Sequence, residues 1–196
     1  MIAIVDYDTG NLRSVCNVLD RIGAEYCITD NHDIIKAADK VLLPGVGEAS
    51  SAMQKLNERG LCDVIKGLRQ PVLGICIGLQ LMCRRSEEGN AECLGIFNTD
   101  VRKFVPSPAD GVKVPHMGWN EIKNLESPLF KGIDEGAFVY FVHSFAPDVC
   151  EGTIATSSNG REFAAAINKD NFYGAQFHPE KSGAIGELIL KNFIEL

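Results

Sequence analysis

The chain has 196 residues, 45% of them hydrophobic, a length that suits one domain with a single sizeable core, and we expect one domain over residues 1–196. Nucleic acids and anionic membranes bind clustered Lys and Arg, so the net charge of -7 argues against both as partners. Seven cysteines without a Cys-x-x-Cys pair argue against a disulfide framework and a zinc cluster, and favour a reducing cytoplasm.

The first half of the chain alternates short apolar runs with helical patterns. Residues 2–5 predict a strand, and the apolar spacing over residues 12–22 predicts a helix that ends at Gly23. Similar units follow, with a strand over residues 40–43, helical patterns between residues 49 and 68, and a strand over residues 72–75. His32, in the turn-like segment 31–33, is expected to be a solvated loop residue. The alternation implies a parallel sheet flanked by helices.

After about residue 87 the pattern changes to short strand-like runs separated by turn signals. These runs cover residues 100–104, 118–122, 138–141, 152–157, 163–168 and 172–177. An amphipathic pattern over residues 185–193 predicts a helix at the C-terminal end. We therefore expect an α/β fold with an open, largely parallel central sheet flanked by helices and a mixed or antiparallel second half.

Cys76 lies at the junction of the predicted strand 72–75 and a following helical pattern. Such a strand-to-helix turn is typical of a nucleophile elbow, which exposes the reactive side chain. Gly74 and Gly78 allow the backbone to come close without a Cβ clash. A buried structural cysteine is equally compatible with this segment alone, because free cysteines are among the most buried residues.

A partner for Cys76 is found at the end of the predicted strand 172–177. His178 is followed two residues later by Glu180, and the intervening Pro179 favours an extended backbone that would project both side chains to one side. A nucleophile, a histidine and an orienting carboxylate form the arrangement that covalent catalysis requires. Strand ends at Cys76 and His178 would meet at one edge of a parallel sheet.

A covalent thioester intermediate also needs hydrogen-bond donors for its oxyanion. The glycine-bearing turn of residues 43–47 follows another predicted strand, so its amides could face Cys76. We expect one donor from the Ile77 amide and the other from the amide of Val46 or Gly47.

Together these residues resemble the class I glutamine amidotransferases. The triad of that family corresponds to residues 74–80 (GICIGLQ) and 177–180 (FHPE), and the resemblance spans nearly the whole chain. Further segments are similar to the glutaminase subunits of imidazole glycerol phosphate synthase, namely residues 6–12 (DYDTGNL), 43–47 (LPGVG), 115–120 (PHMGWN) and 140–145 (YFVHSF). The resemblance implies a flavodoxin-like fold and no cofactor or metal.

The resemblance also implies roles for individual residues. Gln80 and Glu88 would contact the L-glutamine substrate, with Glu88 at its ammonium group, although Glu87 beside it leaves the register open. The segment of His143, Ser144 and Phe145 would border the substrate carboxylate. Asn11, Trp119 and Lys181 would lie at the face shared with a partner.

That partner would be a separate cyclase chain with a (β/α)₈ barrel, which forms a heterodimer with this chain and consumes its ammonia. Two alternatives remain open at this stage. One is an amidotransferase subunit that supplies ammonia to a nucleotide-sugar or polysaccharide pathway. The other is a non-catalytic redox-sensing α/β domain in which Cys76 is an oxidisable thiol.

Overall fold

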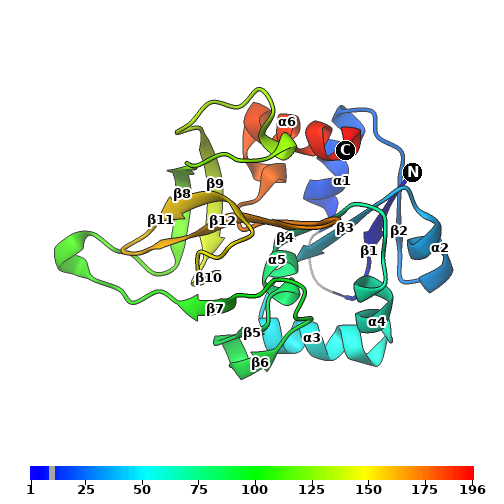
Figure 1. Ribbon diagram of the computed structural model, residues 1–196, viewed down its shortest axis with the longest axis horizontal. Coiled ribbons are helices and arrows are strands. Elements are labelled where there is room, and N and C mark those ends of the chain that lie inside the picture. The colour runs from blue at the N-terminus through cyan, green and yellow to red at the C-terminus, as the bar shows by residue number, and fades with distance from the viewer. Residues whose placement is uncertain (9–11) are drawn as a thin grey trace.

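A seven-stranded sheet forms the centre of the computed structural model, which describes residues 1–8 and 12–196 (Figure 1). Its strands, in the spatial order β11-β12-β13-β4-β3-β1-β2, are Thr153–Ser158, Glu162–Lys169, Phe172–Ala175, Val72–Cys76, Lys40–Gly45, Ile2–Val5 and Tyr26–Thr29. The five strands from β13 to β2 are parallel, whereas β11 and β12 are antiparallel to their neighbours. The expected α/β fold with a largely parallel sheet and an antiparallel second half is confirmed.

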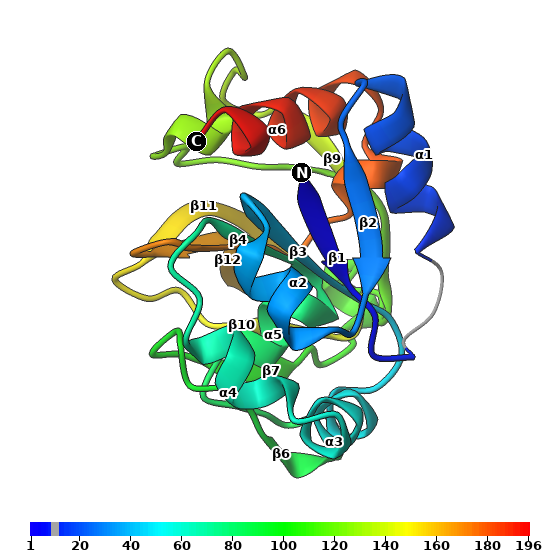
Figure 2. The same cartoon turned by 90° about the vertical axis from the view of Figure 1, so that its right-hand side faces the viewer.

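Helices cover both faces of this sheet (Figure 2). Helices α1 (Arg13–Arg21) and α6 (Gly183–Glu195) lie on one face, and α3 (Ala49–Glu58), α4 (Leu61–Lys66) and α5 (Ile77–Met82) lie on the other. Every residue of β1 and β4 is buried, which explains why these strands read as continuous apolar runs rather than alternating ones. No helix in the described ranges is long and apolar enough to cross a membrane.

Two smaller sheets flank the central one. The first contains β10 (Phe145–Pro147), β7 (Asp100–Lys103), β5 (Arg85–Ser86) and β6 (Ala91–Glu92). The second is an antiparallel pair of β8 (His116–Glu121) and β9 (Phe138–His143), in which His116 lies opposite His143. Short 3₁₀ turns lie between these strands, at Glu88–Asn90, Pro108–Asp110 and Pro128–Phe130, and a further one at Pro179–Lys181 precedes α6.

The prediction for His32 was wrong. His32 is the first residue of α2 (His32–Ala37), and its Nε2 lies 2.8 Å from the carbonyl oxygen of Arg59. Asn31 is the N-cap of this helix and accepts hydrogen bonds from the amides of Asp33 and Ile34. A helix of six residues with one buried side chain has too little apolar periodicity to be recognised in the sequence.

Gly78 is the position where the fold tolerates a side chain least. A Cβ atom there would lie 1.7 Å from the carbonyl oxygen of Leu43 on β3, so α5 packs directly against the sheet backbone. We expect Gly78→Ala to lower the free energy of unfolding by at least about 3 kcal/mol, as measured by urea denaturation. Gly67→Ala is the control, because its Cβ would approach no atom closer than 3.2 Å. Equal stability of the two variants would contradict this account of the packing.

Candidate active site

Cys76 is held in a sharp turn at the carboxyl end of β4. Its φ of 53° and ψ of -107° lie in a region that side-chain-bearing residues rarely adopt. A Cβ on Gly74 would lie 2.6 Å from the carbonyl carbon of Gly78, so only glycines allow the strand and the helix to approach this closely. The predicted strand–turn–helix geometry around Cys76 is present in the structure.

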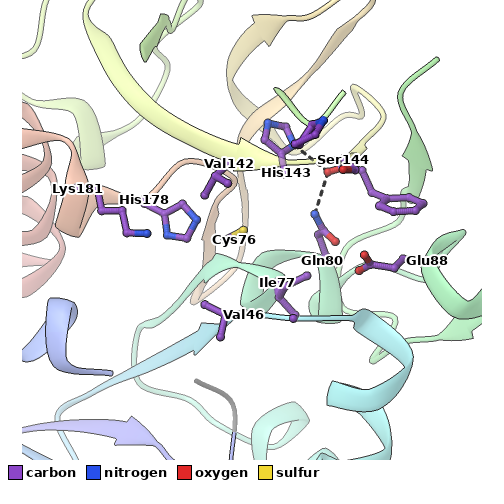
Figure 3. A pocket seen from close by; sticks show the side chains of 13 residues that line it. Val46, Cys76, Ile77, Gln80, Glu88, Val142, His143, Ser144, His178 and Lys181 are labelled. Carbon is purple, nitrogen blue, oxygen red and sulfur yellow. Dashed lines mark hydrogen bonds between the residues drawn. The ribbon is translucent and has the colours of Figure 1, made fainter. Parts of the chain in front are cut away.

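A cavity of about 310 Å³ opens beside the sulfur of Cys76 (Figure 3). Most of the predicted site residues line it, although they come from distant parts of the chain. Its lining comprises Val46, Gly47, Cys76, Ile77, Gln80, Glu88, Pro115, Val142, His143, Ser144, Phe145, His178 and Lys181.

His178 and Glu180 form a buried ion pair next to Cys76. The His178 Nδ1 atom lies 2.7 Å from Oε1 of Glu180, and the other ring nitrogen, Nε2, has no hydrogen-bond partner among the described residues. Glu180 lies in the 3₁₀ turn Pro179–Lys181, so the expectation that an extended backbone would align the two side chains was wrong. The turn, and not an extended backbone, places the Glu180 carboxylate beside the His178 ring.

This environment sets the charge of His178. Burial lowers the pKa of its imidazole, but contact with the Cys76 thiol and the hydrogen bond with Glu180 outweigh burial and raise the pKa to about 10. The ring is therefore an imidazolium at neutral pH. A positive charge beside the sulfur favours the thiolate, which is the nucleophilic form of cysteine.

Val46 and Gly47 directly follow β3, the strand that neighbours β4. Gly45 is the pairing partner of Cys76, so the two residues after it lie next to the nucleophile and line the same cavity as Ile77. Gly45 is tightly packed, because a Cβ there would lie 2.7 Å from the Tyr7 hydroxyl oxygen. Gly47 has a φ of 95°, and a Cβ there would meet no atom of the described chain within 4 Å.

Gln80 and Glu88 lie on the cavity wall. The side-chain nitrogen of Gln80 donates to the Phe145 carbonyl oxygen at 3.0 Å, whereas its Oε1 has no partner among the described residues. Glu88 accepts a hydrogen bond from the Ala49 amide at 3.0 Å, and burial raises the pKa of its carboxyl group. Glu87 does not line the cavity and accepts from the Lys103 amide instead.

His143, Ser144 and Phe145 form the opposite wall, at the end of β9. The Nδ1 atom of His143 donates to the carbonyl oxygen of Phe145 at 2.8 Å. Burial lowers the pKa of His143 to about 3, so its ring is neutral at physiological pH. His143 is thus unsuited to a role as a cation or general acid.

Of the three residues expected at a partner face, two lie in the described part of the chain. Trp119 is 55% exposed on β8, and its ring lies edge-on to Tyr140 with 6.1 Å between centroids. The ammonium group of Lys181 lies 5.9 Å from the Tyr140 ring centroid, and Lys181 also lines the cavity. Asn11 lies outside the described residues.

Gln176 also contacts the nucleophile, and its type and position in the sequence gave no reason to assign it a role. Its Nε2 donates to Sγ of Cys76 at 3.6 Å, and its Oε1 accepts from Gln80 at 3.0 Å. A buried amide two residues before His178, at the end of an otherwise apolar strand, is the one signal that could have identified it.

Comparison with known proteins assigns the chain to a family. The family profile described as "Glutamine amidotransferase class-I" matches residues 3–196. The chain belongs to the class I glutamine amidotransferase family. It is 57% identical to a protein of Bacteroides fragilis and 54% identical to one of Bacteroides thetaiotaomicron, each time over 100% of this chain and 99% of the relative. A relative from Escherichia coli K12 is 49% identical with the same coverage. All three are named "Imidazole glycerol phosphate synthase subunit HisH".

Solved structures of low sequence identity share the fold of this amidotransferase. A protein from Thermoplasma acidophilum, described as a putative subunit of GMP synthase, has a TM-score of 0.75 at 21% identity, and the match covers 99% of this chain and 92% of that protein. A second structure, described as a glutamine amidotransferase, has a TM-score of 0.73 at 17% identity, and the match covers 100% of this chain and 98% of that protein.

Replacing the carboxylate beside His178 tests the charge of the triad. Without that carboxylate, Glu180→Gln is expected to lower the pKa of His178 by at least about one unit from about 10, as measured by NMR titration of the ring. Because the folded-state pKa exceeds the ordinary 6.5, the ion pair stabilises the wild-type fold fully below pH 6.5 and loses this effect as the pH rises through about 10. Glu187→Gln, which removes a surface carboxylate paired with Arg21, is the control and leaves the titration unchanged. An unaltered titration in Glu180→Gln would refute the assignment.

Proposed function

We propose that this chain is the glutaminase subunit of an imidazole glycerol phosphate synthase, formed by a single domain over residues 1–196. It hydrolyses L-glutamine to glutamate and ammonia and passes the ammonia to a cyclase subunit. The observation that carries the proposal is Cys76 at a strained strand end beside the buried His178–Glu180 pair, on the wall of one cavity. The similarity to HisH subunits over the whole length of the chain supports imidazole glycerol phosphate synthase as the enzyme to which this subunit belongs.

The reaction begins with attack of the Cys76 thiolate on the side-chain carboxamide carbon of glutamine. The carbonyl electron pair moves to oxygen, and a tetrahedral intermediate forms with a carbon–sulfur bond. The His178 imidazolium then gives its Nε2 proton to the amide nitrogen, and the carbon–nitrogen bond breaks. Ammonia leaves, the γ-glutamyl group remains on Cys76 as a thioester, and His178 is neutral.

The second half of the reaction regenerates the enzyme. Neutral His178 accepts a proton from a water molecule, whose oxygen attacks the thioester carbon. Collapse of this second tetrahedral intermediate breaks the carbon–sulfur bond and releases glutamate, whose new γ-carboxyl group gives its proton to solvent. The sulfur returns as the thiolate and His178 as the imidazolium, with Glu180 holding the ring through Nδ1 in both steps.

The cavity supplies the groups that such a reaction needs. The Ile77 amide and an amide of Val46 or Gly47 would bind the oxyanion of both intermediates. Gln80 would offer the substrate its Oε1, which has no partner among the described residues, and Glu88 would offer a carboxylate to the substrate ammonium group. The substrate carboxylate would lie against the segment Ser144–Phe145.

A partner protein follows from the chemistry of the product. Ammonia in bulk water at neutral pH becomes mostly ammonium, which is not a nucleophile, so useful transfer requires an enclosed route. Met117 and Trp119 expose apolar surface on β8, and the Lys181 ammonium beside the cavity forms no ion pair among the described residues. A cyclase that is a (β/α)₈ barrel would dock on this face as a heterodimer and make imidazole glycerol phosphate and aminoimidazole carboxamide ribotide.

Substituting the nucleophile separates its catalytic role from a structural one. In the complex with the cyclase, Cys76→Ala and Cys76→Ser are expected to lose at least about 10⁴-fold of glutamine-dependent synthesis, because the thioester cannot form. Synthesis from added ammonium salt is expected to be unchanged, since it bypasses this site. Cys83→Ala, at a buried cysteine seven residues later, is the matched control and retains both activities. Loss of both activities in the Cys76 variants would mean that Cys76 is structural.

The isolated chain is expected to hydrolyse glutamine poorly. Glycine adopts a wide range of backbone conformations, and a Cβ added to Gly47 would meet no described atom within 4 Å, so the second oxyanion donor can be out of place until a partner docks. One missing oxyanion donor costs about 10² to 10³ in rate, so we expect at least about a 100-fold rise in glutamate formation when the cyclase and its nucleotide are added. Full glutaminase activity of the purified chain alone would contradict this coupling.

A further inference from the structure

A continuous chain of hydrogen bonds between neutral groups ends on the sulfur of Cys76. It begins near the surface on β8, crosses to β9 and then passes through two buried amides, and Figure 3 shows the part of it that runs from His143 to Gln80. Its members, in order, are Asn120, His116, His143, the Phe145 carbonyl, Gln80, Gln176 and Cys76.

The direction of each hydrogen bond in the histidine pair is determined by the Phe145 carbonyl. A carbonyl oxygen only accepts, so His143 carries its proton on Nδ1, and as a neutral ring it must accept at Nε2. His116 lies 3.0 Å from that Nε2 and therefore donates from its own Nδ1. Burial lowers the pKa of His116 as well, so this ring is also neutral and accepts at Nε2 from the amide nitrogen of Asn120 at 3.1 Å.

The other hydrogen bonds of Asn120 agree with this direction. The side-chain nitrogen of Asn120 also donates to the Ser158 carbonyl oxygen at 2.9 Å, and its oxygen accepts from the Glu121 amide at 2.9 Å. Its orientation is thus determined independently of the histidines.

The same carbonyl orients the two glutamine amides. Phe145 accepts from Gln80 at 3.0 Å, so the nitrogen of Gln80 faces this carbonyl, and its second hydrogen goes to Oε1 of Gln176, also at 3.0 Å. With its oxygen held by Gln80, Gln176 must present its nitrogen to the sulfur of Cys76. The reverse orientation would place oxygen lone pairs against the sulfur, which would disfavour a thiolate.

We propose that Gln176 stabilises the thiolate of Cys76 by donating a hydrogen bond to its sulfur, and that His116 and His143 are positioning residues that hold the Phe145 carbonyl, whose oxygen determines which end of each glutamine amide faces the nucleophile. The inference deepens the proposed glutaminase function and rests on it. Gln176 is completely buried, so its hydrogen bond to the sulfur does not compete with water. His178 is the charged group that faces the same sulfur, with Glu180 behind it.

The pH dependence of Cys76 alkylation by iodoacetamide tests this proposal. Peptide mass spectrometry resolves Cys76 from the other six cysteines, and the assay requires neither glutamine nor a partner. Gln176→Met keeps the side-chain length but removes the donor, and is expected to shift the alkylation midpoint upward by about one pH unit, a tenfold lower rate below the midpoint. Gln176→Glu is expected to shift it further, because a carboxylate would face the sulfur.

Two variants of His116 test the positioning role without touching the neighbours of Cys76. His116→Phe keeps the ring that stacks on Phe141 but removes the donor to His143, so the midpoint is expected to shift in the same direction by a smaller amount. His116→Asn places an amide nitrogen where Nδ1 was and is expected to behave like the wild type. Should Gln176→Met fail to fold, this pair of variants decides the proposal.

A buried amide elsewhere serves as the matched control. Asn192 donates to the carbonyls of Leu129 and Lys131 on the α6 side of the sheet, and Asn192→Leu is expected to leave the midpoint unchanged even where it lowers stability. Continued protection of the buried Cys83 from alkylation shows that each variant is folded.

The possible outcomes separate the inference from the function on which it rests. An unshifted midpoint in Gln176→Met overturns the role of Gln176, and an unshifted midpoint in His116→Phe, or a shifted one in His116→Asn, overturns the positioning role. If the wild-type complex with the cyclase hydrolyses glutamine while the midpoints do not shift, only the inference fails. If that complex hydrolyses no glutamine, the proposed function fails, whatever the midpoints show.

Discussion

The backbone conformation of Cys76 is the constraint on which the rest of the site depends. A non-glycine residue with a φ of 53° costs roughly 1–3 kcal/mol, and it persists only where the surroundings leave no alternative. Here β4 is buried on both faces, and α5 packs so closely on β3 that Gly78 has no room for a methyl group. The turn between them is therefore imposed by the packing of the sheet, and it aims the sulfur into the cavity that His178 and Gln80 also line.

Two hydrogen-bond systems of opposite character meet at this sulfur. On one side, contact with the Cys76 thiol and the carboxylate of Glu180 keep His178 positively charged despite its burial. On the other, His143 is similarly buried, but its hydrogen-bond partners in the described part of the chain are only the Phe145 carbonyl and the neutral His116, so burial prevails and the ring stays uncharged. A second imidazolium in this cavity would repel the first and weaken its pairing with the thiolate. Hydrogen bonds between neutral groups can orient the amides near Cys76 without adding that repulsion.

Fully buried and clearly amphipathic elements were predictable from the sequence, and elements with few buried side chains were not. The continuous apolar runs of β1 and β4 and the helical periodicity of α6 give enough signal for their type and place to be recognised. No residue of the strand β2 is fully buried and the helix α2 buries a single side chain, so neither element leaves an apolar pattern in the sequence. For the site, the cysteine, histidine and carboxylate could be predicted because their chemistry is distinctive. The role of Gln176 could not, because it depends on which end of an amide faces the sulfur, and this orientation is determined by residues up to about 100 positions away in the sequence.

The turn after β3 shows how such a site can be both rigid and adjustable. Gly45 is enclosed by Tyr7, Ile77 and Gly78, and the Tyr7 hydroxyl donates to the Pro44 carbonyl at 2.8 Å, so the first half of the turn cannot rotate without disrupting the core. Two residues later, a Cβ added to Gly47 would meet no described atom within 4 Å, and the side chain of Val46 is exposed beside the cavity. Of the two ends of the turn, the Val46–Gly47 end is therefore the one with space for a change of conformation, and it is also the end that a docked chain could touch. If this end carries an oxyanion donor, as we propose, its rearrangement would leave the nucleophile and its two hydrogen-bond systems in place.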